Sequence, residues 1–296
     1  MNEGMTTVCF VGGAARSGTT MVQSILCSDQ EANPLLTEVS PLTIMLKGHR
    51  DSVKNFHLFP GMYFNDETEI DTLYASLMKK FIYHVKNKYK CKNLVLRAPV
   101  ITKFFPILKR LIDSVEYRTK FICVVRDPRS TISSMITWNQ RSKAKKEKGI
   151  FKYDRNIGEI TSFYNSFYLE LLRNRKSFTE ESLLFIRYED VVSNAKDAVG
   201  TLSSYSGLDL KSYDPLADWE RVEYNFADKG SIYSPAITPL YGKPISNERI
   251  FSYKEMLEPH EIAEIEERCE LIFRRFDYTR DFDEELISDI EEIESD

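Results

Sequence analysis

Residues 8–20 read Val-Cys-Phe-Val-Gly-Gly-Ala-Ala-Arg-Ser-Gly-Thr-Thr, and this stretch decides the fold. The apolar run from Val8 to Val11 ends in Gly12-Gly13, which predicts a buried strand that enters a tight turn. From Thr20 to Cys27 the apolar residues repeat at helical spacing, so a helix should follow the turn. A strand, a glycine turn and a helix in this order are typical of the start of a parallel α/β sheet.

Three more apolar runs of strand length follow along the chain: Leu94 to Leu96, Phe121 to Val125 and Leu183 to Ile186. Helical periodicity lies between them, and we expect Pro259 to start a last helix whose apolar face continues to Phe276. Residues 140–158 and 211–247 are expected to be irregular. Without a repeat or a long linker, residues 1–296 should form one α/β domain in three α/β/α layers around a central parallel sheet.

Charge and composition exclude several classes of protein. The 296 residues carry a formal net charge of −5, but residues 281–296 hold nine acidic and no basic side chains, so residues 1–280 have 40 basic against 36 acidic ones. We expect a solvated acidic tail there, and a mildly basic body suits a small anionic ligand better than nucleic acid. No run of 18 apolar residues predicts a membrane span.

The cysteines and the start of the chain indicate the compartment. The five cysteines are widely spaced and four lie inside apolar patterns, with no CxxC pair, so we expect buried thiols and neither disulfides nor a zinc site. Met1 to Thr7 lacks the basic start and apolar stretch of a signal peptide. We therefore expect a cytoplasmic protein.

The turn after the first strand is predicted to bind a phosphate-like group. Gly13 to Thr20 matches the nucleotide-binding pattern GxxxxGK[ST] in both glycines and the final Thr, but Thr19 stands where Lys is required. Glycines let the backbone wrap around an anion, and the following helix presents its N–H groups. The lysine that acts on β- and γ-phosphates is absent, and the nearest cation is Arg16. The loop therefore predicts anion binding and argues against γ-phosphoryl chemistry.

A second candidate site follows the strand Phe121 to Val125. It reads Arg126-Asp127-Pro128-Arg129, and Ser134 lies about two turns into the helix expected from Pro128. Arg126 comes off the carboxyl end of a strand, which is where ligands bind in open parallel sheets. A guanidinium and a hydroxyl eight residues apart can clamp a second phosphate.

Together the two motifs resemble those of sulfotransferases that use 3′-phosphoadenosine 5′-phosphosulfate (PAPS), a family with a P-loop-like fold. In that family an RSGTT loop holds the 5′-phosphosulfate, which implies this role for Arg16-Ser17-Gly18-Thr19-Thr20. An R-D-x-R-x4-S segment holds the 3′-phosphate, which implies Arg126 and Ser134. The order of the motifs and their separation of about 110 residues also resemble the family.

Two later blocks extend this resemblance over roughly residues 7 to 280. Phe185-Ile186-Arg187-Tyr188-Glu189-Asp190 is similar to the family's "RYED" strand, whose tyrosine approaches the cofactor, so Tyr188 is a candidate cofactor contact. Lys229-Gly230-Ser231 is similar to a late loop that closes over the nucleotide, which implies that Ser231 lies near the sulfonate.

The pattern is most similar to the tyrosylprotein-type branch, in which a glutamate about twenty residues past the first loop is the catalytic base. Glu38 matches it, and Arg97 before Pro99 stands where that branch has a lysine. The cysteines of that branch are absent, since Leu36 and Val95 occupy about their places, and Trp138 replaces a basic residue. The branch match therefore supports the mechanism better than it supports the substrate.

The resemblance implies an enzyme that moves a sulfuryl group from PAPS to an acceptor and releases 3′-phosphoadenosine 5′-phosphate (PAP), without a metal. Glu38 would be the general base, and Arg16 and Arg97 would stabilise the transferred group. We expect a small-molecule hydroxyl as the acceptor, with an amine second, and no nucleic-acid or membrane partner. A protein tyrosine or a carbohydrate is the alternative acceptor. The sequence fixes neither the acceptor nor the oligomeric state.

Two other functions remain open at this point. One is a P-loop nucleotide kinase, in which Asp127 after the third apolar run would bind Mg²⁺. The other is a nucleotide-binding protein without catalytic activity. Thr19 in place of lysine counts against the first, and the presence of both Glu38 and Arg97 counts against the second, because binding alone needs neither.

Overall fold

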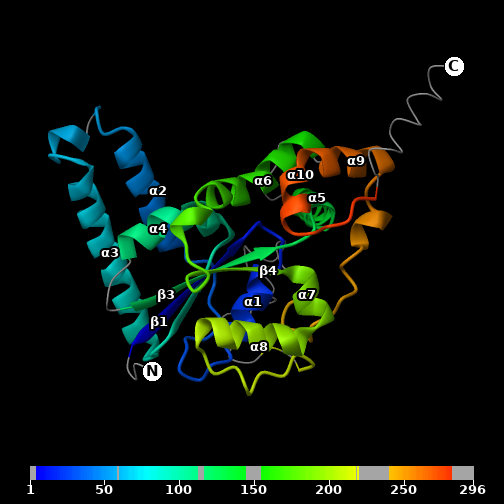
Figure 1. The fold of residues 1–296 in the computed structure, drawn as a ribbon, viewed down its shortest axis with the longest axis horizontal. Coiled ribbons are helices and arrows are strands. Elements are labelled where there is room, and N and C mark those ends of the chain that lie inside the picture. The colour runs from blue at the N-terminus through cyan, green and yellow to red at the C-terminus, as the bar shows by residue number, and fades with distance from the viewer. Residues whose placement is uncertain are drawn as a thin grey trace.

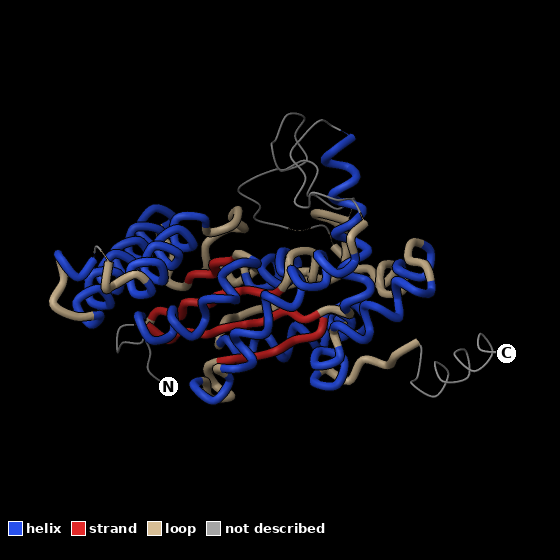
Figure 2. Tube along the Cα trace, turned by 90° about the horizontal axis from the view of Figure 1, so that it is seen from above, coloured by secondary structure: helices blue, strands red, loops and turns tan. Residues whose placement is uncertain are grey.

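A computed structural model describes residues 5–58, 60–112, 117–144, 155–217, 219 and 240–281. Its sheet has four parallel strands in the order β2-β1-β3-β4. The strands are β1 (Thr6–Gly13), β2 (Leu94–Arg97), β3 (Tyr117–Val125) and β4 (Leu183–Arg187). They cross the middle of the molecule with helices on both sides (Figures 1 and 2).

Ten α-helices are found within the described ranges. They are α1 (Thr19–Leu26), α2 (Ser40–Lys54), α3 (Glu67–Tyr89), α4 (Phe105–Ile112), α5 (Pro128–Ala144), α6 (Ile157–Arg173), α7 (Tyr188–Ser193), α8 (Ala195–Ser206), α9 (Pro259–Arg268) and α10 (Glu270–Arg275). Short 3₁₀ helices span Pro60–Met62, Pro99–Phe104, Arg175–Ser177 and Ser252–Glu255. None of these helices is both long and apolar enough to cross a bilayer.

The alternation of side chains along β1 divides the core into two layers. Val8 and Phe10 pack into the larger core, to which α2 to α6, α9 and α10 contribute. Cys9 and Val11 point to the other face and pack against α1, α7 and α8. The two groups of helices lie on opposite sides of the sheet in Figure 1. The expected three-layer α/β/α architecture with a central parallel sheet is thus confirmed.

Strand β3 is longer than its apolar run predicts. It begins at Tyr117, four residues before Phe121, and its first half pairs with β1 from Thr6 onward. The side chains of this half are only partly buried or exposed, so the hydrophobic pattern alone gives no signal for it.

The last helix starts at Pro259 as expected, but the prediction of a single helix to Phe276 was wrong. It breaks at Cys269 into α9 and α10. At the break, Asn165 Nδ2 of α6 donates to the carbonyl of Arg268 at 2.8 Å, which diverts an acceptor from the helical ladder. The apolar face itself is buried as predicted.

The two stretches expected to be irregular have different outcomes. The interval 140–158 is partly helical, because α5 continues to Ala144 and α6 begins at Ile157, while residues 145–154 lie outside the described residues. Residues 211–217 and 240–247 have no helix or strand, as expected. Residues 218 and 220–239, with Ser231, and the tail from residue 282 also lie outside the described residues.

All four strands point their carboxyl ends to one edge of the sheet, and the candidate residues follow there. The phosphate loop follows β1, Arg97 ends β2, Arg126 follows β3 and Tyr188 follows β4. In an open parallel sheet this edge is where ligands bind. The fold therefore brings residues that are far apart in the sequence to one place.

Candidate active site

The backbone of the phosphate loop adopts a conformation that requires glycine at position 18. Gly18 has a φ of 94°, and a Cβ built on it would lie 2.6 Å from Tyr188 Cδ2, so a side chain fits neither the backbone nor the space. Arg16 is also left-handed, with a φ of 73°. Ser17 secures the turn, because its N–H and its hydroxyl both donate to the carbonyl of Ala14, at 3.2 and 2.7 Å.

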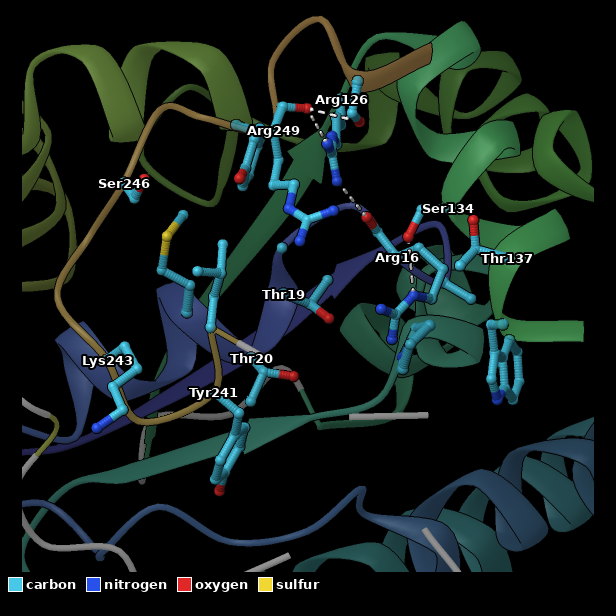
Figure 3. A pocket seen from close by; sticks show the side chains of 18 of the residues that line it. Arg16, Thr19, Thr20, Arg126, Ser134, Thr137, Tyr241, Lys243, Ser246 and Arg249 are labelled. Carbon is cyan, nitrogen blue, oxygen red and sulfur yellow. Dashed lines mark hydrogen bonds between the residues drawn. The ribbon is translucent and has the colours of Figure 1, made fainter. Parts of the chain in front are cut away.

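Arg126 connects the loop to a segment late in the chain. Its Nη1 donates to the carbonyl of Arg16 at 3.2 Å, and its Nη2 donates to the carbonyl of Arg249 at 2.6 Å (Figure 3). Its guanidinium carbon lies 4.3 Å from the centre of the Tyr188 ring. The side chain is buried, and its Nε has no hydrogen-bond partner. A buried, unsatisfied N–H on a cation suits an anionic oxygen as its partner.

Arg16 meets Ser134 across the same cavity. Arg16 Nε donates to Ser134 Oγ at 3.2 Å, and Figure 3 shows the guanidinium of Arg16 below the serine hydroxyl. Burial, together with the nearby charges of Arg126 and Arg141, lowers the pKa of Arg16 to about 10. Arg16 and Arg126 thus face one space, and an anion between these two cations would relieve their repulsion.

Glu38 and Arg97 form an ion pair at the edge of this space. Arg97 Nη1 donates to Glu38 Oε1 at 3.3 Å, and its Nε donates to Gln23 Oε1 at 2.9 Å. Burial lowers the pKa of Arg97, which the Glu38 charge opposes. The Arg97 side chain is 7% exposed and that of Glu38 is 50% exposed, so the carboxylate remains accessible to a substrate. The N–H of Val39 donates to the carbonyl of Arg97 at 2.9 Å, which fixes the Glu38 segment to β2.

One cavity of about 500 Å³ joins these groups. Of the predicted site residues, those that line it are Arg16, Gly18, Thr19, Thr20, Glu38, Arg97, Arg126, Ser134 and Tyr188. Ser17 is fully buried and does not line the cavity, because its side chain is turned inward to Ala14. The predicted contact Ser231 lies outside the described residues.

The second arginine of the Arg126-Asp127-Pro128-Arg129 motif faces the core. Arg129 bonds both carboxylate oxygens of Asp127, at 3.1 and 2.7 Å, and Glu266 at 2.6 Å. Asp127 is buried and does not line the cavity. It therefore occupies no position from which it could hold Mg²⁺ over the loop, which argues against the kinase alternative. Within the described residues, no group of three His, Cys, Asp or Glu side chains could hold a metal ion.

Sequence reasoning missed several residues of the site. Gln23 lies inside the apolar stripe of α1, and nothing local marks it as a partner of Arg97, 74 residues away. Arg249 and Lys243 line the cavity from a segment without a recognisable motif. Arg141 had a usable signal, because it follows Ser134 by seven residues on the same helix, a spacing that returns to the same helix face.

Comparison with known proteins identifies the family. The sequence pattern described as the sulfotransferase family matches residues 9–212, more than half of the chain. The chain belongs to the sulfotransferase family. The family expected from the motifs is thereby confirmed, and the protein is a sulfotransferase enzyme. No curated protein matches the sequence.

Two solved structures share the fold of this sulfotransferase. One is the sulfotransferase domain from the curacin biosynthetic pathway, with 13% identity and a TM-score of 0.53, covering 90% of this chain and 98% of that one. The other is the sulfotransferase domain of the olefin synthase of Synechococcus PCC 7002, also with 13% identity and a TM-score of 0.53, covering 90% of this chain and 96% of that one. At this identity the likeness supports the P-loop-like fold alone.

Proposed function

We propose that this sulfotransferase moves a sulfuryl group from PAPS to a hydroxyl, or second to an amine, of a small-molecule acceptor, with Glu38 as the general base. One observation carries the proposal: a single cavity is lined by the phosphate loop, by the buried Arg126 and by the Glu38–Arg97 pair. Anion binding at two points and an accessible carboxylate are what transfer from an anionic donor to a hydroxyl or amine of an acceptor requires.

The donor would be held at both ends. Arg16, Thr19, Thr20 and the loop N–H groups would hold its 5′-phosphosulfate, at the amino end of α1. At the other end Arg126 and Ser134 would hold the 3′-phosphate, and the orphaned Nε of Arg126 supports this fit. Tyr188 would contact the nucleotide between them. Ser231, in the late loop, would lie near the sulfonate.

The reaction would be an in-line displacement at sulfur. A bond forms between the acceptor oxygen and sulfur while the bond from sulfur to the 5′-phosphate oxygen breaks, and that electron pair leaves with PAP. Glu38 takes the acceptor's proton, a role worth roughly 10²–10⁴-fold in rate. Arg97 pairs with the Glu38 carboxylate and, with Arg16, would stabilise the charge that grows on the transferred group and the leaving oxygen.

The cavity has the dimensions of a site for small molecules. Pockets for small molecules typically have about 300–1,000 Å³, and this one has about 500 Å³. Protein tyrosine and carbohydrate remain the alternative acceptors. With a small-molecule acceptor we also propose a cytoplasmic location for the enzyme.

Thermal unfolding with PAP or Mg²⁺-ATP at matched concentration tests the donor. A ligand at about 100 times its Kd stabilises by roughly 2.7 kcal/mol, which is readily seen as a rise in Tm. We expect PAP to give this rise, and Arg126→Ala to reduce it. Because Arg126 is buried, its replacement affects stability by itself, so the quantity to compare is the rise in Tm that PAP produces in each protein. Ser134→Ala serves as a milder second variant. A rise with Mg²⁺-ATP and none with PAP would refute the proposed donor.

A further inference from the structure

One face of α5 forms a wall of the cavity beyond the proposed donor site. Ser134, Trp138 and Arg141 all line the cavity, and spacings of four and three residues bring them to the same helix face. Because a helix rises about 1.5 Å per residue, Arg141 lies about 10 Å further along the axis than Ser134. Trp138 lies between them. The wall therefore continues past the serine with a large aromatic surface and then a cation.

Arg141 is available to a ligand. Its side chain is exposed. The ion pairs between described residues engage other arginines, such as Arg97 and Arg129, and none of them involves Arg141. Helical side chains lean toward the amino end of their helix, so Arg141 leans back over the turn that carries Trp138. The indole of Trp138 and the guanidinium of Arg141 thus belong to adjacent turns on one face of α5.

The cavity has more positive charge than the donor site uses. Its charged lining comprises two carboxylates, Glu38 and Glu255, and six cations, Arg16, Arg97, Arg126, Arg141, Lys243 and Arg249. The proposed donor contacts occupy Arg16, Arg97 and Arg126. Arg141 extends the positive lining along α5, past the serine proposed for the 3′-phosphate and past Trp138. A neutral acceptor would leave the charge of Arg141 without an ionic partner in the cavity.

We propose that Trp138 and Arg141 form the acceptor subsite, and that the acceptor is a hydroxyl compound with a flat apolar body and a carboxylate. The apolar body lies on the Trp138 indole, the carboxylate pairs with the Arg141 guanidinium, and the hydroxyl reaches Glu38. This inference rests on the proposed function, because it assigns the rest of the cavity to the donor. A guanidinium is suited to a carboxylate, since its two parallel N–H groups match the two oxygens.

The test compares acids with their own amides. The probes are 4-hydroxybenzoate, 4-hydroxyphenylacetate and 3-(4-hydroxyphenyl)propionate, each with its primary amide, so that every pair differs in charge and hardly in shape. Calorimetry on the full chain saturated with PAP measures binding to the wild type, Arg141→Gln and Arg141→Lys. Lys143→Gln is the matched control, because Lys143 is the other basic residue in the last turn of α5 and does not line the cavity.

We expect at least one acid to bind the wild type about tenfold more tightly than its amide, as one charged hydrogen-bonding contact allows. Arg141→Gln should abolish this preference, Arg141→Lys should retain part of it, and Lys143→Gln should leave it intact. The proposal is overturned if no acid is preferred over its amide, or if the preference survives Arg141→Gln.

Binding of PAP alone separates this proposal from the one it rests on. Unchanged PAP affinity in Arg141→Gln is the expected result. If the variant loses PAP affinity, Arg141 belongs to the donor site and the acceptor assignment is wrong. If PAP fails to bind even the wild type, the proposed donor is wrong, whatever the acids do.

Discussion

Gln23 Oε1 accepts a hydrogen bond from Arg97 Nε at 2.9 Å, and both side chains are buried. The contact joins α1, directly behind the phosphate loop, to the end of β2. Because Arg97 in turn donates to Glu38, the three residues form a chain from the donor loop to the proposed base. Gln23 thus acts as a positioning residue for the arginine and, through it, for the carboxylate.

Replacing Gln23 by Met should reduce turnover more than it reduces donor binding. The variant keeps the volume but leaves the Arg97 N–H buried without its acceptor, an effect of about 1–3 kcal/mol. We expect kcat to fall about tenfold or more, while the Kd for PAP changes less than threefold. Steady-state kinetics and a PAP titration measure the two quantities. A parallel loss of both would mean that Gln23 supports the loop rather than Arg97.

Changing Glu38 to Gln should remove most of the activity and little of the stability. A general base contributes roughly 10²–10⁴-fold, and a half-exposed side chain contributes little to folding. The matched control is Glu255→Gln, since Glu255 is the other carboxylate that lines the cavity. Turnover of both variants at saturating PAPS provides the measurement. Equal losses in the two would indicate a general effect of charge and would exclude a specific base at Glu38.

Ser134 should contribute to donor affinity through its hydroxyl. In the structure this hydroxyl accepts from Arg16, and in the complex it would turn to the 3′-phosphate. Ser134→Ala should weaken PAP binding about five- to tenfold, the effect of one hydrogen bond to a charged group. Ser142→Ala is the control, because Ser142 lies buried on the same helix away from the cavity. Calorimetric titration measures the affinity of both variants for PAP. If the two variants bind PAP equally well, Ser134 does not contribute to the donor site.

The sequence was sufficient for the parts of the site that local patterns encode. The glycine turn, the strand before Arg126 and the strand before Tyr188 each combine an apolar run with an adjacent polar signal. Their convergence follows from parallel pairing alone, because all the strands end at the same edge. The resemblance implied that Glu38 and Arg97 belong to the same site, and their ion pair is a contact that the structure adds.

What escaped prediction depends on contacts between distant residues. Arg126 Nη2 donates a hydrogen bond to the carbonyl of Arg249, which lies 123 residues later in the chain. No local sequence pattern predicts such a contact. The break at Cys269 arises from Asn165, a side chain of another helix. In the sequence, Gln23 is only a polar residue within an apolar helical stripe. Its role depends on the hydrogen bond from Arg97, which the sequence does not reveal. These are tertiary effects, and periodicity is insensitive to them.

Glu189 should make stability depend on pH. Burial raises the pKa of this carboxyl above 4.5, opposed by hydrogen bonds from the N–H of Asp127 and the hydroxyl of Tyr278. The folded state therefore binds this proton more tightly than the unfolded state does. Its contribution to the free energy of unfolding is fully present below pH 4.5 and is lost as the pH rises through the raised pKa.

Glu189→Gln removes this titration, so its stability relative to the wild type should improve as the pH rises from 4 toward 7. Urea unfolding of both proteins at several pH values measures the difference. We expect the variant to be less stable overall, because the Glu189 carboxylate accepts two hydrogen bonds in the wild type. The test is therefore the direction in which the difference in stability changes with pH. A gap between the two proteins that is constant with pH, or that moves the other way, would show that Glu189 titrates alike in the folded and unfolded states.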